Sequence, residues 1–427
     1  MKNNAFKVFH EFEQKDLKYC FIRSLNDFDN AFLVDNSDID LIVEKIKFVE
    51  YKNILNNNSF FNLFKHKSFY YVNQNISFDL YNGYYERFIQ LDINKALNNR
   101  VKKDFFMLSD IDLFKVLLFH PMDLCGVRGV RYYSKERSEW IKNNLNILTE
   151  NKEEFETYFG KKFIFKIINY IQNNEFDKIK QDNLKFKILM YLHKPSYLKY
   201  FFQRLKKKII KPEYQKSKLI IFMGVDGSGK TTAAQNSINF MKRYYGNNAS
   251  KIEYFYLGSQ GGYMLPLVQI AQMKDKLKSL FKEEKIQKVD RAKSKNTVSS
   301  NHGKLKEMLF IFEYIARYIK LQYLLKIKNK IVVSDRYLYD YFRTDNTDPK
   351  MVKFFSKIFP KPDFIFMMEG DIQKFYDRKQ EYSPKILKEH QDDLINGLTK
   401  EGLEFYSINA NQDEEEVLKS ILRKLGD

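Results

Sequence analysis

An apolar run followed by a glycine-rich turn constrains the fold of this 427-residue chain more than any other feature. Residues 219–223 read Leu-Ile-Ile-Phe-Met, the continuous apolar run that a strand buried on both faces of a parallel sheet needs. The turn that follows satisfies the pattern G-x-x-x-x-G-K-[ST] in full, and a helix is predicted over residues 232–241. In this order, the strand, the turn and the helix direct backbone N–H groups and a helix N-terminus at phosphate oxygens.

The turn predicts a binding site for a nucleotide triphosphate, with ATP and Mg²⁺ as cofactors. Lys230 is expected to bridge the terminal phosphates, and Thr231 is expected to ligate Mg²⁺. The residues expected to bind the nucleotide are Gly224, Asp226, Gly227, Ser228, Gly229, Lys230, Thr231 and Thr232.

Further strand-like runs follow at residues 252–257, 331–334 and 363–368, with helical stretches between them. Strands separated by helices imply an α/β fold with a parallel, doubly wound sheet. Residues 274–304 are polar, basic and poor in pattern, and residues 293–302 are predicted to form a mobile loop.

The glycine turn, together with Ser-Asp-Arg-Tyr at residues 334–337, resembles the thymidylate-kinase family of P-loop kinases. The resemblance extends to residues 362–368, 378–382 and 408–410 and covers about half of the chain. It implies that Asp335 lies near the metal and the reacting group, and that Arg336 holds the phosphate of the acceptor. The alternative for these two residues is an ion pair that caps a helix.

Phosphoryl transfer needs cations around the charge that spreads over the transferring group. Lys230 is the cation of the loop itself, and Ser228 stands where some family members carry an arginine. A further catalytic cation is therefore expected from the segment after residue 377. Arg378 is the best candidate, with Lys379 and Lys385 behind it, and a solvated helix face is the alternative.

The acceptor side departs from the family pattern. Thymidylate kinases usually carry an arginine-containing turn after the second strand, whereas residues 256–266 here read Tyr-Leu-Gly-Ser-Gln-Gly-Gly-Tyr-Met-Leu-Pro. This difference disfavours dTMP and predicts a different, larger anionic acceptor.

A second group of carboxylates lies near the N-terminus. Short strand-like runs occur at residues 19–22, 41–43, 69–72 and 76–81, so a small mixed α/β domain is expected. Asp38 and Asp40 are two apart in such a run and point to the same face, and Asp79 lies on a later strand. Three carboxylates placed in this way can hold the divalent metals of nucleotidyl transfer.

This arrangement resembles the minimal nucleotidyltransferases of the polymerase-β superfamily over about the first 125 residues. The Gly-Ser turn of that superfamily reads Arg23-Ser24 here, so binding is expected more than catalysis. A near-copy of the acidic motif begins at Ser109, but helical spacing follows it. Ser109 and Asp112 are therefore predicted to form a capping box.

Apolar residues recur at three and four from about residue 108 to 205, which predicts a helical middle segment. Residues 204–217 combine a run of charges with a proline, and we expect the main linker there. The predicted domains are a nucleotidyltransferase-like domain over 1–107, a helical domain over 108–210 and a kinase-like domain over 217–427.

The net charge of +19, from 73 Lys and Arg against 54 Asp and Glu, favours anionic partners or a lysine-rich solvated surface. We expect a nucleotide triphosphate and a small anionic acceptor; nucleic acid and a second copy of the chain as a homodimer stay open. No apolar run reaches the roughly 18 residues of a spanning helix, and no secretory leader is recognisable, so a cytoplasmic protein is expected.

Three functions compete at this point. The first is a kinase for a small metabolite, a nucleotide or sugar-type acceptor of surface-polysaccharide assembly by family resemblance, fused to a nucleotidyltransferase-like module. The second is a true thymidylate or nucleoside-monophosphate kinase with a degenerate N-terminal half. The third is an ATP-controlled regulator or defence protein that binds nucleic acid.

Overall fold

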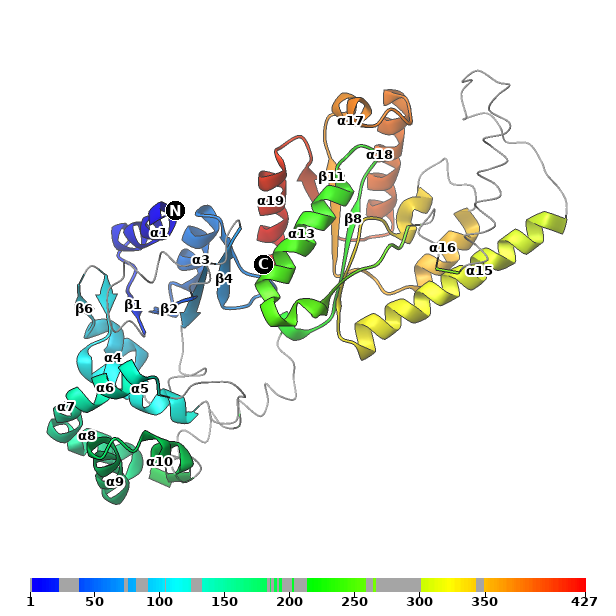
Figure 1. Ribbon diagram of the computed structural model, residues 1–427. Helices are drawn as coiled ribbons and strands as arrows, with labels where there is room; N and C mark the ends of the chain where they lie inside the picture. The colour runs from blue at the N-terminus through cyan, green and yellow to red at the C-terminus, as the bar shows by residue number, and fades with distance from the viewer. Residues whose placement is uncertain are drawn as a thin grey trace. The chain divides into compact units, whose positions relative to one another are not determined.

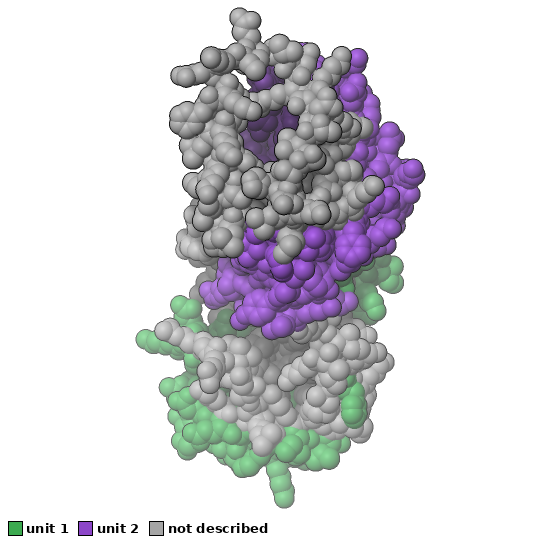
Figure 2. Space-filling model, turned by 90° about the vertical axis from the view of Figure 1, so that its right-hand side faces the viewer, with its two compact units in different colours: residues 1–214, 426 green, residues 215–425, 427 purple. Residues whose placement is uncertain are grey.

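The computed structural model describes residues 2–22, 38–72, 76–81, 91–103, 105–123, 133–182, 213–258, 264–265, 301–342 and 349–427, together with 185, 188–189, 192–193 and 202. The chain divides into two compact units, residues 1–214 with 426 and residues 215–425 with 427, which Figure 2 colours separately. Within the described ranges, no helix combines the length and the apolar composition that crossing a bilayer requires. A finer, three-part division of the chain stays a prediction.

The first unit contains a mixed seven-stranded sheet with strand order β3-β4-β5-β2-β1-β7-β6. Its strands and the helices around them are α1 (Lys2–Gln14), β1 (Tyr19–Phe21), β2 (Asp38–Val43), α3 (Phe48–Asn57), β3 (Phe60–Phe61), β4 (Ser68–Tyr71), β5 (Ser77–Tyr81), α4 (Ile93–Asn98), β6 (Val101–Lys102) and β7 (Phe106–Met107).

The two faces of this sheet are covered by different helices because side chains alternate along each strand. One face packs on α1 and α3, and its core is strongly aromatic around the ring of Phe9. That ring lies 4.8 Å from the ring of Phe105 and 5.1 Å from the ring of Phe21, centroid to centroid. The opposite face, which includes Cys20 and Ile42, packs on α4 and α5 (Asp110–Asp123).

A group of helices follows the sheet, up to Gln181, within the segment for which the apolar spacing predicts helices. After α5 these helices are α6 (Lys135–Asn143), α7 (Leu145–Glu150), α8 (Lys152–Phe159), α9 (Lys161–Gln172) and α10 (Phe176–Gln181). Their apolar faces share one core, to which α9 contributes Phe163, Ile164, Ile167, Ile168 and Ile171 at helical spacing.

The second unit is built on a five-stranded sheet with order β12-β11-β8-β10-β9, and every pairing in it is parallel. The short helix η2 (Glu213–Gln215) contains the boundary between the two units. The elements that follow it are β8 (Lys218–Met223), α13 (Lys230–Tyr245), η3 (Gly246–Lys251), β9 (Ile252–Tyr254), α15 (Asn301–Gln322), η5 (Tyr323–Ile327), β10 (Ile331–Ser334), η6 (Leu338–Phe342), α16 (Pro349–Ile358), β11 (Phe364–Glu369), α17 (Ile372–Arg378), α18 (Pro384–Lys400), β12 (Tyr406–Asn409) and α19 (Glu414–Gly426).

Helices cover both faces of this parallel sheet, as Figure 1 shows. Leu219, Ile221 and Met223 of β8 face a core formed with α15, α16 and α18, whereas α13 and α19 lie on the other side of the sheet. All six residues of β8 are buried, which agrees with its continuous apolar sequence. The doubly wound parallel sheet expected from the sequence is therefore present.

Several boundaries differ from the predictions, among them the end of β9 and the start of α15. Strand β9 ends at Tyr254 and not at Leu257, because the Leu257 amide donates to the side-chain Oγ of Ser334 at 3.0 Å instead of continuing the ladder. Helix α15 begins at Asn301, so the end of the predicted loop 293–302 is helical. Its first turn is polar and carries no apolar period that could have signalled it. Residues 293–300 of that loop lie outside the described residues.

We expect Phe9→Ala to lower the free energy of unfolding of the first unit by about 3–5 kcal/mol, because the buried ring leaves a cavity. The single tryptophan of the sequence, Trp140, lies in that unit, so its fluorescence during urea unfolding of the full chain measures the change. Phe165→Ala is the control: Phe165 is 60% exposed, and its loss should cost less than about 0.5 kcal/mol. An unchanged fluorescence midpoint in Phe9→Ala would contradict cooperative unfolding of the unit.

Candidate functional site

The glycine turn lies at the carboxyl end of β8 and leads directly into α13. Gly227 has a φ of +83°, and a Cβ built there would lie 2.2 Å from the carbonyl oxygen of Phe375. Gly229 has a φ of +80°, but a Cβ at that position would meet no atom within 4 Å. Both positions need the left-handed conformation that glycine adopts without a steric penalty. Gly227 is closed against α17, whereas Gly229 faces open space.

Lys230 is the buried cation of the turn. Its Nζ donates to the Val225 carbonyl at 3.1 Å and lies 3.4 Å from Oδ1 of Asp226. Burial, followed by the nearby Arg336 guanidinium, lowers the pKa of Lys230 to about 8, against the opposing effect of the Asp226 and Asp340 carboxylates. An anion bound beside Lys230 would favour its charged form, so the site is suited to phosphate.

Asp335 follows β10 and lies beside the turn. Its Oδ2 accepts a hydrogen bond from Oγ1 of Thr231 at 2.7 Å, and its Oδ1 accepts one from the hydroxyl of Tyr254 at 2.7 Å. Burial, and then the bond to Asp335, raise the pKa of Tyr254, so that this hydroxyl stays protonated and donates. Both oxygens of the carboxylate are therefore oriented by hydroxyl groups from other elements.

Arg336 links the turn to η6. Its Nη2 lies 2.5 Å from Oδ1 of Asp226, and its Nη1 lies 3.5 Å from Oδ2 of Asp340. Burial lowers the pKa of Arg336, but the carboxylates of Asp340 and Asp226 outweigh that effect and raise it, so the guanidinium is firmly charged. Arg336 thus forms ion pairs, which was the alternative role considered for it. The pair with Asp226 connects Arg336 to the glycine turn, so it does more than cap a helix.

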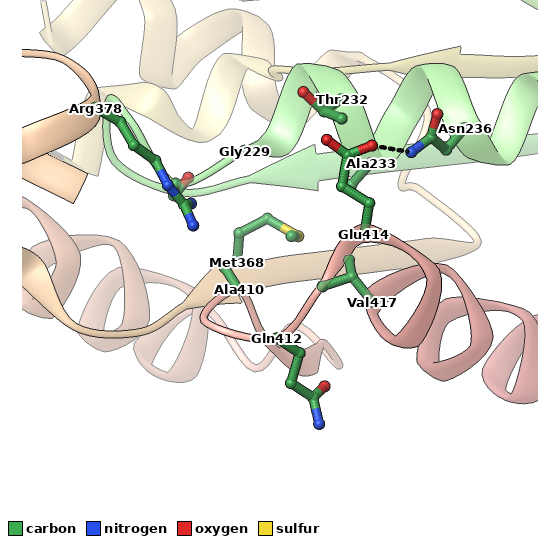
Figure 3. A pocket seen from close by; sticks show the side chains of 11 residues that line it. Gly229, Thr232, Ala233, Asn236, Met368, Arg378, Ala410, Gln412, Glu414 and Val417 are labelled. Carbon is green, nitrogen blue, oxygen red and sulfur yellow. Dashed lines mark hydrogen bonds between the residues drawn. The ribbon is translucent and has the colours of Figure 1, made fainter. Parts of the chain in front are cut away.

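A cavity of about 250 Å³ opens beside the turn (Figure 3). Arg378, the last residue of α17, reaches from one side of it toward the turn, and its role as a further catalytic cation stays a prediction. On the other side, Nδ2 of Asn236 donates to Oε2 of Glu414 at 3.1 Å. The cavity is lined by Ser228, Gly229, Thr232, Ala233, Asn236, Met368, Arg378, Ala410, Gln412, Glu414 and Val417.

The other two lysines of the predicted cationic segment do not line this cavity. Lys379 pairs with Glu381 at 3.2 Å while its side chain stays 49% exposed. Lys385 lies in the first turn of α18 and is also absent from the cavity wall. For Lys379, the alternative of a solvated surface describes the contacts better.

The residues of the turn fit a nucleotide triphosphate and its metal. Oγ of Ser228 is buried and, within the described part of the chain, has no hydrogen-bond partner, so a ligand atom at the cavity could satisfy it. The space in front of Gly229 leaves room for phosphate at the N-terminus of α13. The Thr231 hydroxyl and the Asp335 carboxylate supply adjacent oxygen ligands of the kind that Mg²⁺ prefers.

A buried ion pair within α15 was not identified from the sequence. Glu313 and Arg317 of α15 are each 1% exposed, and Nε of Arg317 lies 2.7 Å from Oε1 of Glu313. Glu313 accepts the backbone N–H groups of Met264 and Leu265 at 2.7 and 2.9 Å, while Arg317 donates to the Gly258 carbonyl at 2.7 Å. The pair therefore holds residues 258 and 264–265, all of which lie within the segment that departs from the thymidylate-kinase pattern. The sequence signal that could have indicated this pair is the spacing of opposite charges at i and i+4 among apolar residues of a helix.

The N-terminal carboxylates are brought partly together. Asp40 of β2 pairs directly with Asp79 of β5 in the parallel register. The hydroxyl of Tyr81 donates to Oδ1 of Asp40 at 3.1 Å, and Lys67 lies 3.7 Å from Oδ2 of Asp79. The side chain of Asp38 lies outside the described residues, and the described ones contain no cluster of three metal-ligating side chains.

The near-copy of the acidic motif lies at the start of α5, where the hydrogen bond from the Asp112 amide to Ser109 is one half of the predicted capping box. Oγ of Ser109 donates to Oδ2 of Asp112 at 2.8 Å, and the Asp112 backbone N–H donates to Oγ of Ser109 at 3.4 Å. Asp112 is also 3.7 Å from Lys115 within α5. These contacts assign Asp112 to the helix start. Arg23 and Ser24 lie outside the described residues.

Together, the buried strand, the glycine turn and the helix give the second unit the geometry of a P-loop α/β unit. No protein-family model and no curated protein matches the sequence. Among solved structures, the chain is similar to thymidylate kinase from Ehrlichia chaffeensis, with 18% identity and a TM-score of 0.30 over 49% of this chain and 98% of that chain.

Two alanine substitutions in the turn should separate its structural and ligand-facing glycines. Gly227→Ala forces a methyl group against the Phe375 backbone, so we expect a clear fall in thermal stability of the second unit. Gly229→Ala meets open space and should cost only the strain of about 1–2 kcal/mol, while its methyl group obstructs phosphate. Thermal denaturation and calorimetric ATP titration measure both effects. Equal melting temperatures for the two variants would contradict this assignment.

Proposed function

We propose that residues 215–425 form an ATP-dependent kinase that transfers the γ-phosphoryl group to a small anionic acceptor. The hydrogen bond between Thr231 and Asp335 is the observation that carries the proposal. It joins the phosphate-binding turn to the carboxyl end of β10, where Arg336 follows in sequence. Groups suited to the donor, the metal and the acceptor therefore converge at the ends of β8 and β10, where open α/β sheets bind ligands.

Each residue has a role that follows from its charge and position. Bound ATP with Mg²⁺ supplies the transferable phosphoryl group and part of its charge neutralisation. Lys230 would bind terminal phosphate oxygens, and Thr231 with Asp335 would hold the metal. Arg336 would bind an anionic group of the acceptor, and Arg378 would add positive charge from the cavity side. Positioning and electrostatics of this kind supply most of the catalysis of phosphoryl transfer.

The turn after β9 bears on the choice of acceptor. The turn after β9 lacks the arginine of thymidylate kinases, and Gly258 packs closely there, since a Cβ on it would lie 2.9 Å from Cβ of Arg336. Losing a charge-assisted bond to a monophosphate weakens binding by about 1.5–3 kcal/mol. A sugar phosphate or another nucleotide is therefore favoured over dTMP. A role in surface-polysaccharide assembly rests on family resemblance alone.

The kinase proposal predicts acceptor-stimulated ADP release that depends on Lys230. Lys230→Ala should lower turnover about 10²-fold or more, because it removes the cation of the turn from the transferring group. The assay measures ADP with dTMP, other nucleoside monophosphates and a panel of sugar phosphates, and dTMP should be a poor acceptor. Lys242→Ala, which removes an exposed lysine from the same helix, is the matched control.

Unchanged turnover in Lys230→Ala would contradict the kinase assignment. Efficient turnover of dTMP would instead favour a true thymidylate kinase with a degenerate N-terminal half. ATP-dependent assembly or DNA retention without any acceptor-stimulated ADP release would favour a nucleic-acid-binding regulator.

We also propose a divalent-metal site in the first unit, formed by Asp38, Asp40 and Asp79. The direct pairing of Asp40 with Asp79 supports it. The ion pair between Lys67 and Asp79 opposes it, because a metal ion there would have to displace the Lys67 ammonium. Nucleotidyl transfer at this site rests on resemblance, so the proposal is limited to metal binding.

Manganese binding tests this second proposal. In a full-length Asp335→Asn background, which removes the metal site of the kinase unit, Asp40→Asn with Asp79→Asn should abolish the remaining Mn²⁺ binding measured by electron paramagnetic resonance. Asp110→Asn with Asp177→Asn removes two exposed carboxylates from helix first turns and should leave Mn²⁺ bound. Equal Mn²⁺ binding by the two double variants would rule out the metal site.

A further inference from the structure

One oxygen of Asp226 faces two cations that the proposed function assigns to different substrates. Oδ1 of Asp226 lies 2.5 Å from Nη2 of Arg336 and 3.4 Å from Nζ of Lys230. The Asp226 side chain is 8% exposed, as is that of Lys230, and that of Arg336 is 19% exposed. All three charges are therefore largely withdrawn from water, where they interact more strongly than on the surface.

The two cations differ in what else they contact. Arg336 also pairs with Asp340 at 3.5 Å, whereas Lys230 otherwise donates to the Val225 carbonyl. Within the described part of the chain, Asp226 is the carboxylate that is bonded to Lys230. Lys230 and Arg336 repel each other, and Asp226 lies between them as the counter-ion that they share.

We propose that Asp226 is a positioning residue that couples the ATP site to the acceptor site by sharing one carboxylate oxygen between Lys230 and Arg336. The inference rests on the proposed function, since it takes Lys230 as the donor-side cation and Arg336 as the acceptor-side cation.

The coupling follows from what Asp226 does when one of its cations is withdrawn. An anion that engages Arg336 draws it from Asp226, whose negative charge then acts on Lys230 alone and competes with the phosphates of ATP. In the same way, an anion that engages Lys230 draws it from Asp226, and the Asp226 carboxylate then attracts Arg336 more strongly and competes with the acceptor. If both are engaged, the largely buried Asp226 carboxylate has lost its contacts with both cations, which is costly. Each ligand should therefore weaken the binding of the other by the same factor.

A double-variant cycle measures this coupling with one known probe and needs no acceptor. The probe is a non-hydrolysable ATP analogue with Mg²⁺, titrated calorimetrically into the full chain. Arg336→Ala leaves Asp226 to Lys230 alone, so it should weaken analogue binding about tenfold, within the usual coupling range of about 5- to 150-fold. In an Asp226→Asn background, Arg336→Ala should change the affinity less than about threefold, which is what remains of direct attraction.

Two control backgrounds separate this role from a general loss of structure. Asp340→Asn removes the other carboxylate beside Arg336, and Arg336→Ala should still weaken analogue binding about tenfold in that background. Asp226→Glu keeps the charge and should also retain the effect. Asp226→Ala replaces Asp226→Asn in the cycle if the latter does not fold.

The outcomes distinguish this inference from the proposed function. If the unmodified chain fails to bind the ATP analogue, the nucleotide site itself is wrong. If the chain binds the analogue and Arg336→Ala has the same effect with and without Asp226, the shared counter-ion is wrong while the nucleotide site stands. A loss of the Arg336 effect in Asp340→Asn as well would assign the coupling to total charge and overturn the specific role of Asp226.

Discussion

Backbone hydrogen bonds between β8 and β10 are the constraint on which the rest of the site depends. The parallel register pairs Ser334 with Ile221, so both strands end at the same edge of the sheet. The glycine turn leaves β8 there, and Asp335 and Arg336 leave β10 beside it. Thr231 and Asp335 are 104 residues apart in sequence, yet their side chains meet at 2.7 Å. A shift of either strand by one residue would reverse its side chains and separate these groups.

Several charged side chains of the second unit lie in poorly solvated surroundings. Lys230, Asp226, Arg336 and Asp340 form a cluster at the turn, and Glu313 with Arg317 forms another within α15. Breaking a buried pair leaves an uncompensated charge and typically costs about 3–5 kcal/mol. The two clusters therefore fix local geometry: the first holds Lys230 and Arg336 beside the turn, and the second holds the backbone at residues 258 and 264–265.

The first unit shows how context separates two similar acidic motifs. Asp40 lies on a strand and faces Asp79 across the ladder, whereas Asp112 lies in the first turn of α5 and bonds to Ser109. Helical spacing after Ser109 predicted this difference. The ion pair of Lys67 with Asp79 was not foreseeable, because Lys67 directly precedes β4 and no local pattern specifies that β4 pairs with β5.

The sequence by itself determined the features that local chemistry controls. These include the buried strand β8, the glycine turn with its left-handed residues, the parallel α/β character and the helical segment with its periodic apolar face. The sequence also singles out Arg378 as a candidate cation; Arg378 lines the cavity beside the turn, and its catalytic role stays a prediction.

Only the tertiary structure decided which distant side chains meet. Tyr254 orients Asp335, Asp226 joins Lys230 to Arg336, and Glu313 holds the backbone of Met264 and Leu265. The cavity also depends on the tertiary structure, because part of its wall comes from β11 and α19. Contacts of this kind depend on strand order and helix packing, which bring together residues that are remote in sequence. A local pattern specifies the conformation of a segment but not its neighbours in space.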